Sequence, residues 1–187
     1  MAKTPEKVDV YLETGAKRTF AGAAAWPGWS RSGRDAESAL QALLDYGPRY
    51  AQVMQIREIA FDSPVTASAF NVIEQIEGNA TTDFGAPGVA PGFDAEPVDA
   101  AELTRLTAVL QACWQTFDEI AQSAAGKALR AGPRGGGRPT DKILWHVINA
   151  EAGYLASLDG KTKMEEKASP DQDNARDRQP VRDTSPR

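Results

Sequence analysis

Residues 26–46, WPGWSRSGRDAESALQALLDY, constrain the fold more than any other stretch of the chain. A Pro-Gly pair between two tryptophans predicts a tight turn, and the polar run that follows predicts a short extended strand. Asp35 stands at the expected N-cap of a helix, where its carboxylate can accept a hydrogen bond from the amide of Ser38. The next apolar residues recur on one helical face, namely Ala36, Ala39, Leu40, Leu43 and Leu44. The stretch therefore predicts a turn, a strand and a capped amphipathic helix.

This arrangement resembles the core of the HicB-like family, the antitoxin-type domains of bacterial toxin–antitoxin pairs. In that family a Pro-Gly turn, a short strand and the pattern Gly-x-Thr-x-x-Glu-Ala-Leu lead into a helix. The matching residues here are Pro27, Gly28, Gly33, Asp35 in place of Thr, Glu37, Ala39 and Leu40. Trp29 stands where the family has a small residue or Cys, and no DNA-binding motif follows. The resemblance covers residues 8–50 and implies a small antiparallel sheet with one packed helix, and a regulatory role through a partner.

Three further segments predict strands. Residues 8–13 alternate apolar and polar side chains, residues 18–24 can pair back after a Thr-Gly turn, and residues 70–76 read as a fourth strand. Gly47-Pro48 is expected to stop or sharply kink the helix, because proline lacks an amide hydrogen and clashes with the preceding turn. Residues 49–60 fit either a helix or a strand, and we favour a helix.

The second half of the chain is predicted to be helical. Residues 79–98 are rich in Gly and Pro and have no periodicity, which indicates a linker or a functional loop. Residues 99–125 and 141–158 each show helical periodicity, and the short break between them indicates an antiparallel pair. The apolar stripe of the first helix, expected to be buried, consists of Leu103, Leu106, Leu110, Cys113, Trp114, Phe117, Ile120 and Ala121. Beyond residue 160 the chain is charged and nearly without large apolar groups, which predicts disorder.

The predicted fold class is therefore α+β, a small antiparallel sheet with a packed helix followed by a helix pair. The predicted boundaries are 1–78 for the HicB-like unit, 79–98 for the linker, 99–160 for the helical hairpin and 161–187 for the disordered tail.

Residues 140–158, TDKILWHVINAEAGYLASL, resemble the second helix of the DinB-like superfamily, four-helix bundles that include metal-dependent thiol transferases and isomerases. In those proteins a histidine on this helix is the first of three metal ligands, and His146 falls at that position. The paired histidines that complete the site are absent here. The resemblance covers residues 99–158. It implies, as an alternative function, a transferase or isomerase with a divalent metal ion, or a descendant that has lost this chemistry.

Two residues of this helix are candidates for that alternative chemistry. His146 is the only histidine of the chain and has no second ligand at helical spacing, so an exposed helical histidine is the favoured interpretation over a metal ligand. Glu151 interrupts the apolar face, where a carboxylate needs a partner or a raised pKa. It is interpreted either as a general base or ligand, or, in preference, as a salt-bridge partner of Arg134, Arg138 or another arginine.

A glycine- and arginine-rich loop precedes the same helix. Its free amides, the positive end of the helix and the arginines could together hold a phosphate or carboxylate. The favoured alternative is a flexible connector with solvated charges. The candidate anion-binding residues are Arg134, Gly135, Gly136, Gly137, Arg138 and Thr140.

The tryptophan turn is the candidate protein-interaction surface, because exposed aromatic side chains beside arginines are typical of binding hot spots. Its residues are Trp26, Trp29, Arg31 and Arg34. Cys113 lies on the apolar stripe of the first predicted long helix and is expected to be buried and inert.

Composition bounds the location and the partners. The chain of 187 residues has a net charge of −5, one cysteine and no apolar run of the length that crosses a bilayer. These features predict a cytoplasmic protein without membrane association, and the acidic balance disfavours nucleic acid as a partner. We therefore expect a non-catalytic interaction or regulatory module that binds a protein partner or itself and needs no cofactor.

Overall fold

The computed structural model describes residues 7–129 and 139–157. The chain divides into two compact units, Met1–Thr116 and Phe117–Arg187. The division therefore falls inside a helix, α3 (Ala100–Ala124), and not in the segment 79–98 that the sequence suggested as a linker. The predicted tail, residues 161–187, lies outside the described residues.

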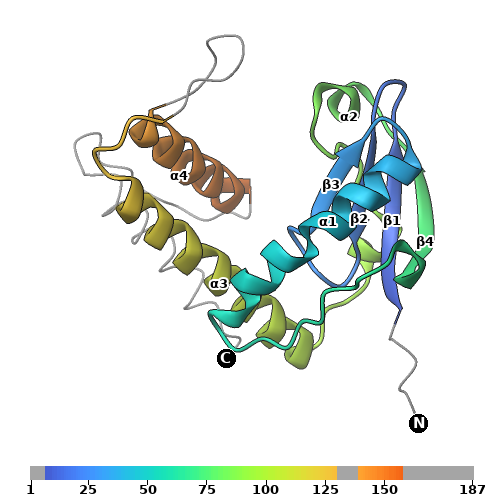
Figure 1. The fold of residues 1–187 in the computed structure, drawn as a ribbon, viewed down its shortest axis with the longest axis horizontal. Coiled ribbons are helices and arrows are strands. Elements are labelled where there is room, and N and C mark those ends of the chain that lie inside the picture. Colours follow the sequence, from blue (N-terminus) through green and yellow to red (C-terminus); the bar gives the residue numbers. More distant parts are fainter. Residues whose placement is uncertain (1–6, 130–138, 158–187) are drawn as a thin grey trace. The chain divides into compact units, whose positions relative to one another are not determined.

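The first unit is built on a four-stranded sheet with strand order β3-β2-β1-β4 (Figure 1). Its strands are β1 (Val8–Thr14), β2 (Thr19–Ala23), β3 (Ser30–Gly33) and β4 (Phe70–Glu77). β2 pairs antiparallel with both of its neighbours, whereas β4 pairs parallel with β1. The predicted fold class, α+β, is confirmed, but the sheet is mixed: the expected antiparallel pairing holds for β1, β2 and β3 and is wrong for β4. The physical reason is the helix between β3 and β4, which carries the chain back to the end of the sheet at which β3 begins, so that β4 runs in the same direction as β3 and β1.

That helix, α1 (Ala36–Gln55), begins as the sequence predicted. Asp35 has an extended backbone, its Oδ1 accepts a hydrogen bond from Ser38 N at 2.8 Å, and the Ser38 hydroxyl accepts from Asp35 N at 3.2 Å. These reciprocal bonds satisfy two amides at the helix start, which have no partner inside the helix. The hydrogen bonds from the Ser38 hydroxyl and amide also lower the pKa of Asp35.

Pro48 does not end the helix, contrary to one of the two outcomes that the sequence suggested. The helix continues to Gln55, so the helical interpretation of the residues after Pro48 is confirmed as far as Gln55. Proline supplies no amide for the carbonyl one turn earlier, at Leu44. At the adjacent carbonyl, of Leu43, the indole Nε1 of Trp29 donates a buried hydrogen bond of 2.9 Å. A side chain from outside the helix therefore supports the backbone next to the interruption.

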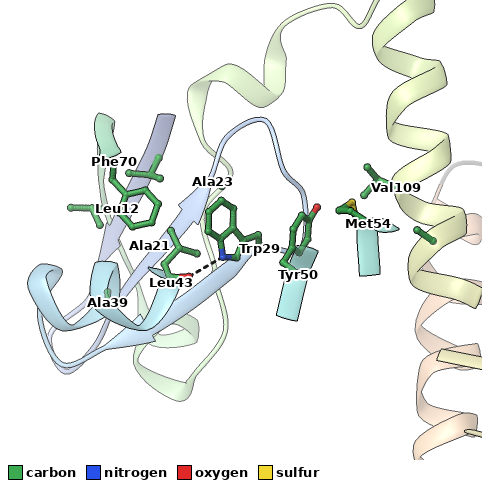
Figure 2. Close-up of a cluster of buried hydrophobic side chains, with 12 residues drawn as sticks. Leu12, Ala21, Ala23, Trp29, Ala39, Leu43, Tyr50, Met54, Phe70 and Val109 are labelled. Atoms are coloured by element: carbon green, nitrogen blue, oxygen red, sulfur yellow. Dashed lines mark hydrogen bonds between the residues drawn. The ribbon is translucent and has the colours of Figure 1, made fainter. Parts of the chain in front are cut away.

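The core lies between the sheet and α1, with Trp29 at its centre (Figure 2). The Trp29 side chain is fully buried. Its ring stacks on Tyr50 at a centroid distance of 5.8 Å and lies 5.0 Å from the ring of Phe61. From the sheet, β1 contributes Val10 and Leu12. The end of α1 and the first part of α3 also contribute residues to this core. The members from the end of α1 and from α3 are Met54, Val109 and Ala112.

Helices α3 and α4 occur close to where the sequence placed them. Asp99 caps α3, because its Oδ1 accepts from Glu102 N at 2.8 Å. The predicted apolar stripe is only partly buried: Trp114 is buried, but Leu103 and Leu110 are exposed, and Cys113 is exposed and not buried as expected. The reason is that α3 turns the neighbouring face, with Val109 and Ala112, into the core.

The other long helix, α4 (Thr140–Ser157), begins at Thr140 itself, so this residue belongs to the helix and does not precede it. The antiparallel arrangement of α3 and α4 stays a prediction. None of the helices in the described part of the chain has the length and apolar character needed to span a membrane.

Replacing Trp29 should destabilise the first unit more than replacing Trp26. In Trp29→Phe the Leu43 carbonyl loses its indole donor and the core loses part of a buried ring, so we expect the free energy of unfolding to fall by about 2–4 kcal/mol. Trp26→Phe is the matched control, because Trp26 is only half-buried. Urea denaturation followed by far-UV circular dichroism measures both. Equal losses in the two variants would contradict the central role of Trp29.

The Asp35 cap should make stability depend on pH. Its folded-state pKa lies below the ordinary value of 3.8, so the cap contributes fully above that pH and is lost as the pH falls through the lowered pKa. Asp35→Asn keeps an oxygen that can accept from Ser38 N but does not titrate. We expect the wild type to lose more stability than this variant between about pH 5 and about pH 2. Parallel losses in urea denaturation would rule out the effect.

Candidate binding pocket at the tryptophan turn

Two carboxylates hold residues 79–98 against the back face of the sheet, which we define as the face opposite α1. Side chains alternate along a strand, so Tyr11 and Glu13 point away from the core residues Val10 and Leu12. Glu74 of β4 lies opposite Tyr11 in the parallel register, and its carboxylate accepts from Gly92 N at 2.9 and 3.0 Å.

Glu13 is the more deeply placed of the two carboxylates and is fully buried. Its oxygens accept from Gly88 N at 2.8 and 3.1 Å, from Val89 N at 3.3 Å and from the hydroxyl of Thr82. Hydrogen bonds to a charged acceptor are strong enough to offset much of the cost of removing it from water. Glu13 therefore fixes the path of the segment that follows β4.

The segment 79–98 is consequently part of the folded unit and not a bare linker. It contains α2 (Ala80–Phe84) and a short 3-10 helix, η2 (Gly92–Ala95). Asn79 caps α2 by accepting from Thr81 N at 2.8 Å, and the ring of Phe93 packs edge-on against Tyr11 at 5.8 Å. The lack of periodicity reflects anchoring through backbone amides, which needs no repeating pattern of side chains.

A pocket of about 200 Å³ opens between η2 and the turn that joins β2 to β3. The Tyr11 ring lies directly over Gly22, where a Cβ atom would clash with the ring. Glycine at this position therefore allows the close approach that shapes the floor of the pocket. The lining residues that matter for recognition are Tyr11, Trp26, Ser30, Phe93 and Asp94.

The polar side-chain groups of the lining residues include the hydroxyls of Tyr11 and Ser30, the Asp94 carboxylate and the indole N–H of Trp26. Ser30 Oγ is buried beside the Tyr11 side chain, with which it interacts. Burial raises the pKa of Tyr11, and the negative charges of Glu13 and Asp94 raise it further, whereas the neighbouring Ser30 side chain lowers it. The Tyr11 hydroxyl consequently stays protonated at neutral pH.

The two tryptophans of the predicted interaction surface have different environments. Trp26 is half-buried and lines the pocket, and the guanidinium of Arg105 lies over its ring at 5.1 Å from the centroid. Trp29 also borders the pocket, but its side chain is fully buried. The expectation that the Trp29 ring forms part of an exposed surface is therefore wrong, because the ring fills the centre of the core.

The two arginines of that predicted surface do not line the pocket. The Arg31 guanidinium lies 3.1 Å from the ring centroid of Tyr46 on α1, so it is on the other face of the sheet. Arg34 is exposed and forms an ion pair of 3.3 Å with Asp35. Exposed pairs of this kind contribute little to stability. The four predicted residues thus do not form one continuous patch.

The remaining predicted site residues lie in the second unit. His146 is exposed on α4 and Glu151 is half-buried on the same helix. Residues 134–138, with the candidate anion-binding Arg134, Gly135, Gly136, Gly137 and Arg138, lie outside the described residues, and so does any pairing of Glu151 with these arginines. Across residues 7–129 and 139–157, no three His, Cys, Asp or Glu side chains are grouped so as to hold a metal ion.

Comparison with protein-family models, with characterised proteins and with solved structures finds no match to this chain. The HicB-like and DinB-like resemblances therefore remain predictions that rest on the sequence motifs.

Removing the charge of Glu13 should loosen the back face. In Glu13→Gln the side-chain amide places a donor near the amides of Gly88 and Val89, and the charge-assisted hydrogen bonds are lost. We therefore expect the free energy of unfolding to fall by about 1–3 kcal/mol. Glu77→Gln, at an exposed position of β4, is the control. Hydrogen exchange at the Gly88 and Val89 amides should accelerate in Glu13→Gln only. Unchanged exchange would show that Glu13 does not hold this segment.

Proposed function

We propose that this chain is a non-catalytic, cytoplasmic protein-interaction module of HicB-like regulatory type, and that the pocket beside the Trp26 turn receives its partner. The observation that carries the proposal is the preformed pocket of about 200 Å³ that the half-buried rings of Tyr11 and Trp26 line. Concave surfaces lined by aromatic side chains and a few polar groups are typical of binding sites.

The aromatic walls support binding to a protein. Trp and Tyr dominate the energetics of protein interfaces, because a large apolar ring with one polar atom gains much on burial. Trp26 and Tyr11 are both half-buried at this pocket. The other wall is fixed in advance by Glu13 and Glu74, so little ordering is required when a partner binds.

The same groups are poorly suited to acid–base or nucleophilic chemistry. A serine nucleophile needs an adjacent base, and the described lining of the pocket offers neither a histidine nor a lysine near Ser30. Tyr11 cannot act as that base at neutral pH, since its pKa is raised above its ordinary value of 10.0. These features favour recognition over catalysis.

Co-purification with a pocket variant tests the proposal. We expect a tagged chain, isolated at low salt, to retain a stoichiometric protein partner that is lost in Ser30→Val, which removes the hydroxyl and narrows the pocket. Ser68→Val, the same exchange at an exposed position of the short 3-10 helix η1 (Ala67–Ala69), should retain the partner. Absence of any partner, or equal retention by both variants, would overturn the proposed role of the pocket.

A further inference from the structure

We infer that the pocket beside the Trp26 turn accepts a basic side chain, a lysine or arginine of the partner. This inference rests on the proposed interaction function and specifies the chemistry of the residue that is recognised. It is drawn from the size of the pocket, the charges around it and the hydrogen-bonding groups that it presents.

The size suits a single side chain. Pockets that bind drug-sized ligands have volumes of roughly 300–1,000 Å³, whereas this pocket has about 200 Å³. Lysine and arginine have long apolar stems that pack along apolar surface while the charged end reaches polar groups. The rings of Trp26 and Phe93 can contact such a stem.

The electrostatic surroundings are negative. Asp94 lines the pocket, and its charge reaches the Tyr11 hydroxyl. The Glu74 carboxylate binds the amide of Gly92, at the start of the short helix η2 that provides Phe93 and Asp94. No lysine or arginine is present among the described lining residues, and residues 62–98 contain six acidic residues and no basic one. An incoming cation therefore meets acidic groups that no basic lining residue neutralises.

The polar atoms also match a cationic donor. An ammonium or guanidinium group donates hydrogen bonds and accepts none. The Asp94 carboxylate lines the pocket and can accept such hydrogen bonds. The Arg105 guanidinium, which lies over the ring of Trp26, is itself paired with Glu102 at 2.6 Å.

Titration of the intact chain with three capped amino acids tests the inference. The probes are the N-acetyl methylamides of lysine, arginine and norleucine, of which norleucine is the uncharged counterpart of lysine. We expect the lysine and arginine probes to shift the backbone NMR signals of Ser30, Phe93 and Asp94 with dissociation constants on the order of 1–10 mM. The norleucine probe should bind at least about threefold more weakly.

A charge-removing variant identifies the responsible group. Asp94→Asn should weaken binding of the lysine probe by about two- to fivefold and leave norleucine binding unchanged. The Asp94 amide donates to Pro91 O at 3.1 Å, and the variant retains this backbone hydrogen bond. Asp62→Asn is the matched control, because Asp62 is an exposed aspartate that does not line the pocket. An equal effect of both variants would attribute the selectivity to net charge and overturn the assignment to Asp94.

The outcomes separate the inference from the proposed function. Equal binding of the lysine and norleucine probes would overturn charge selection. Charge selection would also be overturned if the partner is lost in Ser30→Val but none of the three probes binds to the pocket. In both cases the interaction function stands. Selective binding of the lysine probe without a co-purifying partner would instead support the basic-side-chain site and overturn the partner-binding role.

Discussion

The hydrogen bond from the Trp29 indole to the Leu43 carbonyl is the interaction on which the first unit depends. It joins the turn after β2 to the middle of α1, at the point where Pro48 weakens the backbone of the helix. The same ring contacts Tyr50 and Phe61, which come from the far end of α1 and from the segment after it. One side chain therefore sets the distance between sheet and helix, and helical structure continues past the proline because tertiary packing supports it.

A second constraint acts on the opposite face of the sheet, where packing is replaced by hydrogen bonding. Glu13 and Glu74 accept hydrogen bonds from backbone amides of the segment 79–98, which has too few large apolar residues to form a core of its own. Because the carboxylates are fixed on strands, they place η2 at a defined distance from the tryptophan turn. The pocket between them is thus a consequence of both faces: Trp29 positions one wall, and the two carboxylates position the other.

The local structure was predictable from the sequence, and the tertiary contacts were not. Alternation in residues 8–13 and the Asp35 cap identified β1 and the start of α1, because those signals depend on neighbouring residues alone. The same alternation assigned Glu13 to the polar face, which is correct, but it gave no sign that residues 79–98 would bury that face. The available signals were the free amides of the Gly-rich segment 79–98 and the carboxylate of Glu13. Neither signal identifies the other as its partner, because the two are far apart in the sequence.

The candidate site shows the same division. The sequence drew attention to the turn at residues 26–29, yet two tryptophans three residues apart gave no basis for deciding which ring is buried. Strand pairing decides it, because Trp29 continues the alternation that places Arg31 on the α1 side and Ser30 on the back face. Substituting Trp29 would therefore disturb the core and any bound partner together. Ser30 separates the two effects, since it is a lining residue of the pocket on the back face of the sheet and is not part of the core around Trp29.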